Sequence, residues 1–297
     1  MTPELAAAYA HCQQIANNHY ENFPVASKLL PAHMRRPFAA VYAYSRHVDD
    51  LADEGDASAQ QRFEALDDYG QQLDRAIAGH GTDDKILLAN VDVIRQHNIP
   101  IALYHDLITA FKQDVQQKRY TSHADVLQYC RYSANPVGRI LLHLAGEASE
   151  QNLRDSDDVC SALQLINFLQ DMQQDFHELG RIYLPQSDMD ELGVTEHHLR
   201  NAVSDQAMRA LFKREVARAE TLILRGASLG WRLKGRFGLE IRLIIGGGLR
   251  ILHRLKQLET DVFERPRLRK WDGLWMLWFA LRRQAPAATV NTKLETS

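Results

Sequence analysis

The stretch that decides the fold is Arg46-His47-Val48-Asp49-Asp50-Leu51-Ala52-Asp53-Glu54, in which four acids occupy six positions at the end of an apolar segment. The apolar residues before it recur at helical spacing, which predicts a helix from Met34 to Asp53. Side chains three and four apart share one face of a helix, so the carboxylates of Asp49, Asp50 and Asp53 should lie about 5–6 Å apart, one turn beyond Arg46. Such acids oppose the helix dipole and repel one another. The stretch is either a solvated acidic helix end or a cation site.

A second acidic stripe lies on the helix that the pattern predicts from Asp155 to Leu179. Polar side chains recur there at steps of three and four residues on an otherwise apolar helix. They are Gln164, Asn167, Asp171, Gln174 and Asp175. An ionised carboxylate in an apolar core costs several kcal/mol, so this stripe must face water, a cation or a ligand. Arg181, in the Gly180–Pro185 turn that follows, places a guanidinium beside these acids.

The two acidic helices together predict a Mg²⁺ site on opposite walls of a helical bundle. Mg²⁺ prefers oxygen ligands and commonly keeps phosphate oxygens in its shell, and neighbouring arginines would complete a diphosphate clamp. The clusters are poor in histidine and contain no cysteine, which argues against zinc, and they lack the Glu-x-x-His pairs of a di-iron bundle. The predicted metal ligands, which are also the predicted catalytic residues, are Asp49, Asp50, Asp53, Asp171 and Asp175.

Size and composition are those of an ordinary soluble globular protein. The chain has 297 residues, of which 45% are hydrophobic and 25% charged. Its three cysteines are far apart and lack metal-ligand spacing, which indicates a reducing cytoplasm. We find no signal peptide and no run of the roughly 20 apolar residues that a membrane span requires. We therefore expect a cytoplasmic protein.

Helical patterning dominates the chain, and no alternating strand pattern is convincing, so we expect an all-α fold. The breaks between helices are short, which favours a single domain over residues 1–284, followed by a flexible polar tail at 285–297. The Gly246–Gly248 triplet lacks the context of a phosphate loop and instead predicts close helix packing. The expected helices cover residues 3–19, 34–53, 59–77, 84–96, 101–118, 124–144, 155–179, 204–229, 239–258 and 266–283.

These residues resemble the squalene and phytoene synthases, which couple prenyl diphosphates head to head. The resemblance rests on DDLADE at 49–54, on Tyr129–Gly138, and on 164–185 with its GRIYLP sequence, and it extends along the whole chain. It implies an isoprenoid-synthase helical bundle with a central cavity. It also implies that the five aspartates bind Mg²⁺ and that Arg46, Asn167 and Arg181 hold diphosphate.

Three stretches are similar to the HpnC-type hydroxysqualene synthase branch of this family: NFPVAS at 22–27, SANPVGR at 133–139 and NFLQD at 167–171. This resemblance implies a carbon–oxygen lyase of squalene and hopanoid biosynthesis. Such an enzyme ionises presqualene diphosphate and traps the rearranged cation with water. Two alternatives stay open: a head-to-head prenyltransferase that makes presqualene diphosphate, dehydrosqualene or phytoene, and a non-enzymatic lipid-binding or assembly protein on the same fold.

Three departures from the wider family favour one bound diphosphate over two. The segment after His19 lacks the lysine or serine-rich run of many coupling enzymes. Gly248 stands where the C-terminal helix commonly has a tyrosine. Gln174 stands where an acid often precedes the last aspartate.

The cation left after ionisation needs an apolar cavity with aromatic faces, and its quenching needs one positioned water. Aromatic candidates are Phe23, Tyr42, Phe168 and Tyr183, and polar candidates for the water are Asn135, Asn167 and Gln170; ordinary packing or capping is the alternative role of each. The predicted substrate contacts are His19, Asn22, Phe23, Tyr42, Arg46, Asn135, Asn167, Phe168, Gln170, Arg181 and Tyr183.

The C-terminal third is basic, with 18 Lys and Arg against 7 Asp and Glu between Arg209 and Arg283. Charge alone does not separate anionic lipid, a phosphorylated ligand and nucleic acid. With the motifs considered, we expect a prenyl diphosphate partner, no nucleic acid, and other squalene-pathway enzymes as further candidates. The segment Trp271–Phe279 has basic flanks and is too short to span a bilayer. It is either an interfacial helix at the inner face of the membrane or a core helix or dimer contact.

Overall fold

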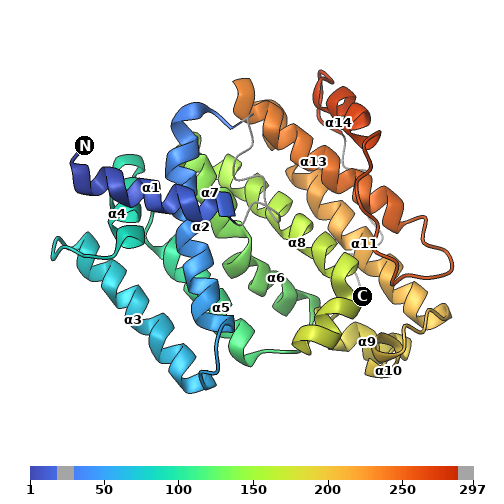
Figure 1. The fold of residues 1–297 in the computed structure, drawn as a ribbon. Helices are drawn as coiled ribbons and strands as arrows, with labels where there is room; N and C mark the ends of the chain where they lie inside the picture. The colour runs from blue at the N-terminus through green and yellow to red at the C-terminus, as the bar shows by residue number, and fades with distance from the viewer. Residues whose placement is uncertain (19–29, 287–297) are drawn as a thin grey trace. The chain divides into compact units, whose positions relative to one another are not determined.

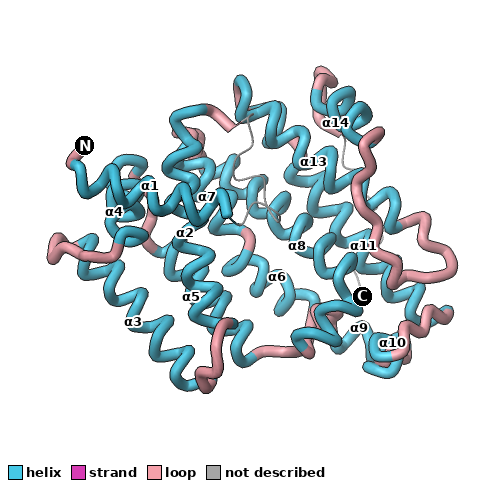
Figure 2. Tube along the Cα trace, viewed as in Figure 1, coloured by secondary structure: helices cyan, strands magenta, loops and turns pink. Residues whose placement is uncertain are grey.

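The computed structural model describes residues 1–18 and 30–286, and all regular secondary structure in these ranges is helical (Figures 1 and 2). The prediction of an all-α fold is confirmed. None of the described helices is long and apolar enough to cross a membrane. The helices are α1 (Pro3–Asn18), α2 (Ala32–Asp53), α3 (Ala59–Ile77), α4 (Lys85–His97), α5 (Ala102–Gln116), α6 (His123–Ser133), α7 (Asn135–Leu144), α8 (Glu150–Leu179), α9 (Gln186–Leu192), α10 (Glu196–Arg200), α11 (Gln206–Gly226), α12 (Leu229–Arg232), α13 (Gly235–Leu255) and α14 (Asp272–Ala280).

The helices group into two compact units. The first contains Met1–Leu153 together with Arg181–Pro185, and the second contains Arg154–Gly180 together with Gln186–Ser297. The expectation of one domain over residues 1–284 stays a prediction. Most of the expected tail at 285–297 lies outside the described residues.

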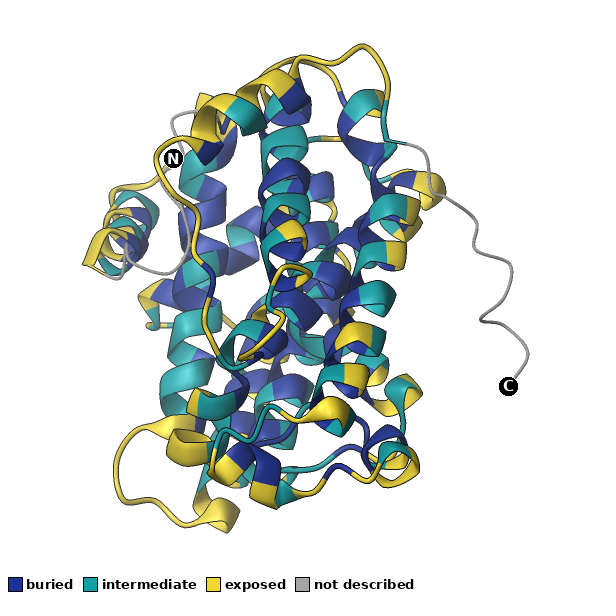
Figure 3. Cartoon of the chain, turned by 90° about the vertical axis from the view of Figure 1, so that its right-hand side faces the viewer, coloured by how far each residue is buried: buried dark blue, intermediate teal, exposed yellow. Residues whose placement is uncertain are grey.

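Helix α2 is central to the first unit, where it contacts α1, α3, α4, α5 and α7. Its buried side chains include Phe38, Val41, Tyr44 and Val48, so the helix is apolar on several sides. Figure 3 shows how buried and exposed residues alternate along the helices. The helix begins at Ala32, two residues before the predicted start. Pro37 therefore lies in the second turn of the helix and not in the first. At this position its missing N–H removes one backbone hydrogen bond of the helix. The acidic motif thus lies on the last turn of a helix that is otherwise largely buried.

A side-chain cap begins α3 at the residue where the sequence predicts it. Ser58 accepts a hydrogen bond from the Gln61 backbone N–H, and the Gln61 side chain accepts one from the Ser58 N–H. This capping box satisfies two N–H groups that the first turn leaves without partners, so α3 has the predicted bounds.

Close helix packing in the second unit depends on glycine. A Cβ atom at Gly246 would lie 2.8 Å from Phe279 of α14, and one at Gly248 would lie 2.6 Å from Ile223 of α11. At Gly226 of α11 it would lie 2.4 Å from the Asp155 carbonyl oxygen of α8. The packing role predicted for the Gly246–Gly248 triplet is confirmed.

Several predicted helix bounds are wrong: α8 begins at Glu150 instead of residue 155, α11 spans Gln206–Gly226 instead of 204–229, and α13 spans Gly235–Leu255 instead of 239–258. The single helix expected over residues 124–144 is broken at Ala134, because Pro136 has no N–H to continue the backbone hydrogen bonds of α6 into α7. The short helices α9, α10 and α12 were not predicted, since four to seven residues are too few to show a period. The last helix begins at Asp272 instead of residue 266.

Candidate functional site

The last turn of α2 carries the first acidic motif around one arginine. Arg46 Nη1 lies 3.1 Å from Asp49 Oδ2, and its Nη2 lies 2.5 Å from Asp50 Oδ1 and 3.1 Å from Glu54 Oε1. The placement of Arg46 on the same face as the acids is confirmed. One guanidinium thus faces three carboxylates, which leaves this helix end with excess negative charge.

The first motif retains unsatisfied polar atoms. Burial raises the pKa of Asp49 to about 6, Arg46 opposes this rise, and Asp53 and Asp50 add to it. Asp50 Oδ1 is buried and, despite its short distance to Arg46, has no hydrogen bond of acceptable geometry; Arg46 Nε is buried without a partner. Crowded carboxylates are ligands that a hard divalent cation prefers, and such a cation would relieve their repulsion.

Asp114, a buried residue of α5, anchors Arg181 in the first unit. Arg181 Nη2 donates a 3.0 Å hydrogen bond to the Asp114 carbonyl oxygen, and its Nη1 lies 3.6 Å from Asp114 Oδ1. On the other side, Nη2 lies 3.7 Å from Asp53 Oδ1. Arg181 Nε is buried without a hydrogen-bond partner. The predicted diphosphate ligand Arg181 therefore lies beside the first motif with one donor unused.

The carboxylate of Asp114 is held by a tyrosine. Tyr129 Oη donates to both Asp114 oxygens, at 2.9 and 3.0 Å. Burial raises the pKa of Asp114 to about 6, and Arg181 and the Tyr129 hydrogen bond oppose the rise. The rings of Tyr129, Tyr120 and Tyr183 lie with their centroids 5.5–5.6 Å apart. Tyr183, a predicted substrate contact, thus belongs to an aromatic cluster behind Arg181.

A small cleft of about 250 Å³ lies at this position in the first unit. Its polar lining consists of Asp53, Asp114, Arg62 and Lys118. Arg62 donates to the carbonyl oxygens of Ala52, at 2.5 Å, and of Gly55, at 2.8 Å, and so closes the loop after α2. The cleft combines carboxylates that can hold a cation with cations that can hold an anion.

The second acidic motif lies on α8 in the second unit. Asp171 Oδ2 accepts hydrogen bonds from Asn167 Nδ2 at 2.8 Å and from Arg265 Nη2 at 3.0 Å. Arg265 Nε lies 2.5 Å from Asp171 Oδ1, yet this buried oxygen has no hydrogen bond of acceptable geometry. Gln170 Nε2 donates to the Pro266 carbonyl oxygen at 2.5 Å. The segment containing Arg265 and Pro266 therefore lies against the predicted stripe, and Asp175 further along it is half-buried.

Within residues 1–18 and 30–286, no three His, Cys, Asp or Glu side chains are arranged to hold a metal ion. In each motif an arginine, Arg46 or Arg265, lies among the aspartates. A Mg²⁺ site built jointly from both motifs stays a prediction.

The remaining predicted contacts are placed as follows. Tyr42 lies one turn before Arg46 on α2 and is half-buried, Asn135 is the buried first residue of α7, and Phe168 is buried on α8. His19, Asn22 and Phe23 lie outside the described residues.

Sequence reasoning missed Asp114 and Arg265. Asp114 had a faint signal, a single acid on the predicted helix 101–118. Arg265 had none, because its contact with Asp171 joins residues 94 positions apart.

The comparison with known proteins agrees with the motifs. The family model for squalene/phytoene synthase matches residues 16–272. The chain is 33% identical to hydroxysqualene synthase of Rhodopseudomonas palustris over 84% of both chains, and 31% identical to 15-cis-phytoene synthase of Synechococcus elongatus over 72% of this chain and 73% of that one. The crystal structure of squalene synthase HpnC from Alicyclobacillus acidocaldarius superimposes with a TM-score of 0.82 at 35% identity, covering 88% of this chain and 97% of that one. The chain belongs to the squalene/phytoene synthase family.

Proposed function

We propose that this isoprenoid synthase is a Mg²⁺-dependent hydroxysqualene synthase, a carbon–oxygen lyase that converts presqualene diphosphate to hydroxysqualene and diphosphate for squalene and hopanoid biosynthesis. The observation that carries the proposal is the 33% identity with a hydroxysqualene synthase over 84% of both chains. The departures at Gly248 and Gln174, which favour one bound diphosphate, support it.

The crowding of aspartates in both motifs supports a divalent cation. Asp49, Asp50, Asp53, Asp171 and Asp175 would hold Mg²⁺ in place of the present ion pairs, in which Arg46 and Arg265 lie 2.5 Å from Asp50 Oδ1 and Asp171 Oδ1. When bound, Mg²⁺ would neutralise charge on the departing diphosphate.

The arginines of the chain supply the rest of the diphosphate contact. Arg46 and Arg181 each have a buried Nε–H without a partner, and a guanidinium binds phosphate oxygens through such parallel donors. Asp114 holds Arg181 from behind through its carbonyl oxygen. Bond breaking would therefore occur where the leaving group meets fixed positive charge.

The apolar side chains have to protect the cation until water reaches it. Tyr42, Tyr183 and Phe168 offer aromatic faces, each worth about 0.5–2 kcal/mol to a nearby cation. Asn135, Asn167 and Gln170 are the candidates for positioning the water. Gln170 Nε2 donates one of its two N–H groups to the Pro266 carbonyl oxygen, so its second N–H and its amide oxygen remain for that water.

The second candidate is a head-to-head prenyltransferase, favoured by the 31% identity with a phytoene synthase. A location of the protein at the inner membrane surface is likewise a proposal and rests on α14. Contact with other enzymes of the squalene pathway also stays a proposal.

One assay separates the candidates. Purified full-length protein with Mg²⁺ is incubated separately with presqualene, farnesyl and geranylgeranyl diphosphate, without a nicotinamide, and the lipids are identified by mass spectrometry. We expect hydroxysqualene from presqualene diphosphate alone. A coupled product from farnesyl or geranylgeranyl diphosphate would establish the transferase. Release of no diphosphate from any substrate would favour a non-enzymatic role.

A further inference from the structure

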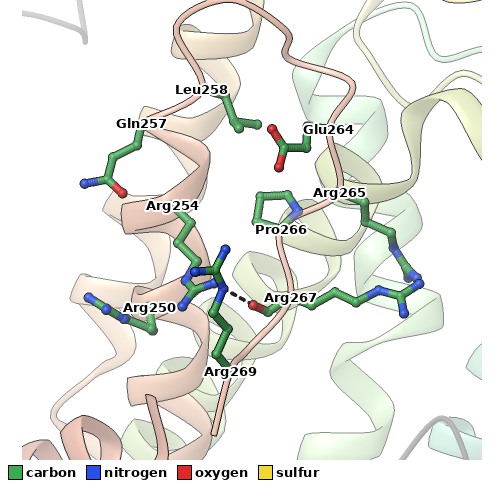
Figure 4. Close-up of a pocket in the computed structure, with 9 residues that line it drawn as sticks. All are labelled: Arg250, Arg254, Gln257, Leu258, Glu264, Arg265, Pro266, Arg267 and Arg269. Atoms are coloured by element: carbon green, nitrogen blue, oxygen red, sulfur yellow. Dashed lines mark hydrogen bonds between the residues drawn. The ribbon is translucent and has the colours of Figure 1, made fainter. Parts of the chain in front are cut away.

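A cavity in the second unit lies beside the second acidic motif, which Arg265 and Pro266 of its lining contact, but its other lining residues have no role in the proposed reaction. It has a volume of about 520 Å³ and lies between the C-terminal half of α13 and the chain segment 264–269 (Figure 4). Its charged lining consists of Arg250, Arg254, Arg265, Arg267, Arg269 and Glu264. The volume falls within the range of about 300–1,000 Å³ that ligand pockets occupy. The lining points to an anionic ligand.

The positive charge of this cavity exceeds what the surrounding acids neutralise. Arg250 Nε lies 2.7 Å from Asp272 Oδ1 and Arg254 Nη2 lies 2.6 Å from Asp272 Oδ2, so one buried carboxylate serves two guanidinium groups. The Arg269 backbone N–H donates to the same carboxylate at 2.6 Å. The Arg269 side chain lines the cavity. That side chain forms no ion pair with any residue in 1–18 or 30–286. Arg254 Nη1 also donates a 2.8 Å hydrogen bond to the Arg267 carbonyl oxygen, the dashed line in Figure 4.

An apolar stripe follows this cavity directly in the chain. Trp271, Leu274, Trp278 and Leu281 are 81%, 65%, 60% and 66% exposed, and they recur at helical spacing along α14. The opposite face of α14 is buried, with Phe279 against Gly246 of α13. The helix therefore packs on one side and presents large apolar side chains on the other, which exceeds ordinary scattered exposure.

Basic residues flank the stripe at both ends. Lys270 precedes it, and Arg282 and Arg283 follow it, all three exposed. The nine residues of α14 extend about 14 Å, too short to cross a bilayer but long enough to lie in its interface. Tryptophan, leucine and flanking cations are the composition of helices that lie at an anionic membrane surface.

We propose that the arginine-lined cavity binds the phosphate of an anionic lipid headgroup while the exposed face of α14 lies among the adjoining acyl chains. Arg250, Arg254 and Arg269 supply the donors, and Trp271 marks the boundary between headgroup and apolar layer. A second copy of the chain fits this surface less well, because a symmetric dimer would bring the same basic residues together. The inference does not depend on which reaction the enzyme catalyses.

The test is cosedimentation of the full-length protein with vesicles of phosphatidylcholine, alone or with added phosphatidylglycerol. We expect binding to the anionic vesicles and little to the neutral ones. The double variant Arg269→Gln/Lys270→Gln should weaken this binding about tenfold or more, because each cation near an anionic surface contributes about 1 kcal/mol. Leu274→Ser/Trp278→Ser should weaken it without changing the preference for anionic lipid.

The matched control is Lys85→Gln/Lys213→Gln, which removes two exposed cations outside this surface and should bind like the wild type. Inorganic phosphate at the same concentration as the lipid phosphate should not displace the protein. Four results would overturn the proposal: equal binding to both kinds of vesicle, an effect of the control as large as that of Arg269→Gln/Lys270→Gln, displacement by inorganic phosphate, or a dimer in light scattering that Leu274→Ser/Trp278→Ser dissociates.

Discussion

At the scale of single residues, the chemistry depends on carboxylates held against arginines. Arg46 and Arg265 occupy positions among the aspartates of the two motifs, and each leaves one buried carboxylate oxygen without a hydrogen bond. Both oxygens lie 2.5 Å from a guanidinium nitrogen, so each aspartate is already neutralised by an arginine that a bound cation would have to displace or join.

The substitutions Asp50→Asn and Asp171→Asn should each reduce diphosphate release at least about 100-fold, since each removes a charge that would hold the cation opposite the leaving group. Thermal melting should show that both variants remain folded. Asp190→Asn, an exposed position on α9, is the control and should retain full activity. Activity retained in either motif variant would refute the metal assignment there.

Asp114 is predicted to act as a positioning residue. Asp114→Asn keeps the carbonyl that binds Arg181 but removes the carboxylate 3.6 Å from Arg181 and 2.9 Å from Tyr129 Oη. We expect kcat to fall about 10–100-fold, as when a supporting hydrogen-bond partner is lost, with a smaller change in KM. Tyr129→Phe should give a smaller loss in the same direction. An unchanged kcat in Asp114→Asn would show that Arg181 is held by its backbone contact alone.

At the scale of secondary-structure elements, glycines decide how closely the helices of the second unit approach. Gly226 permits α11 to reach the backbone of α8 at Asp155. Two ion pairs add to this contact: Arg225 of α11 pairs with Asp158, and Arg232 of α12 pairs with Asp155. The position of α8 matters because the second acidic motif lies on it.

Gly226→Ala should lower the free energy of unfolding by about 1–3 kcal/mol, because the new Cβ would lie 2.4 Å from the Asp155 carbonyl oxygen and the helices would have to separate. The matched control is Gly273→Ala on α14, where a Cβ would meet no atom within 4 Å. Alanine there should stabilise the helix by up to about 1 kcal/mol. Urea unfolding measures both, and equal effects would contradict the packing role.

At the scale of the whole molecule, a buried ionic cluster makes stability depend on pH. Asp188 of α9 contacts Arg214 at 2.8 Å and Arg218 at 2.5 Å, and Arg218 also lies 2.5 Å from Glu215. Burial raises the pKa of Glu215 to about 7 although both arginines oppose the rise. The folded state therefore binds a proton at Glu215 that the unfolded state releases at lower pH.

Stability should accordingly fall as pH rises between about 4.5, the pKa of Glu215 in the unfolded chain, and about 7, because only the folded state holds the proton in that range. Glu215→Gln removes this dependence. We expect the variant to gain about 1–3 kcal/mol relative to the wild type between pH 5 and pH 8, measured by urea unfolding at each pH. A constant difference across that range would show that Glu215 does not titrate there.

The sequence by itself determined the helical class, the two acidic motifs and their spacing on a helix, because these depend on contacts within a few residues. The bounds of α3 and the position of Arg46 beside Asp49 follow from such local geometry. Only the tertiary structure decided that Asp114 holds Arg181, that Arg265 contacts Asp171, and that three arginines gather beside α14. Those contacts join residues tens of positions apart. Their geometry depends on how whole helices pack, and the spacing of residues along the sequence does not contain that information.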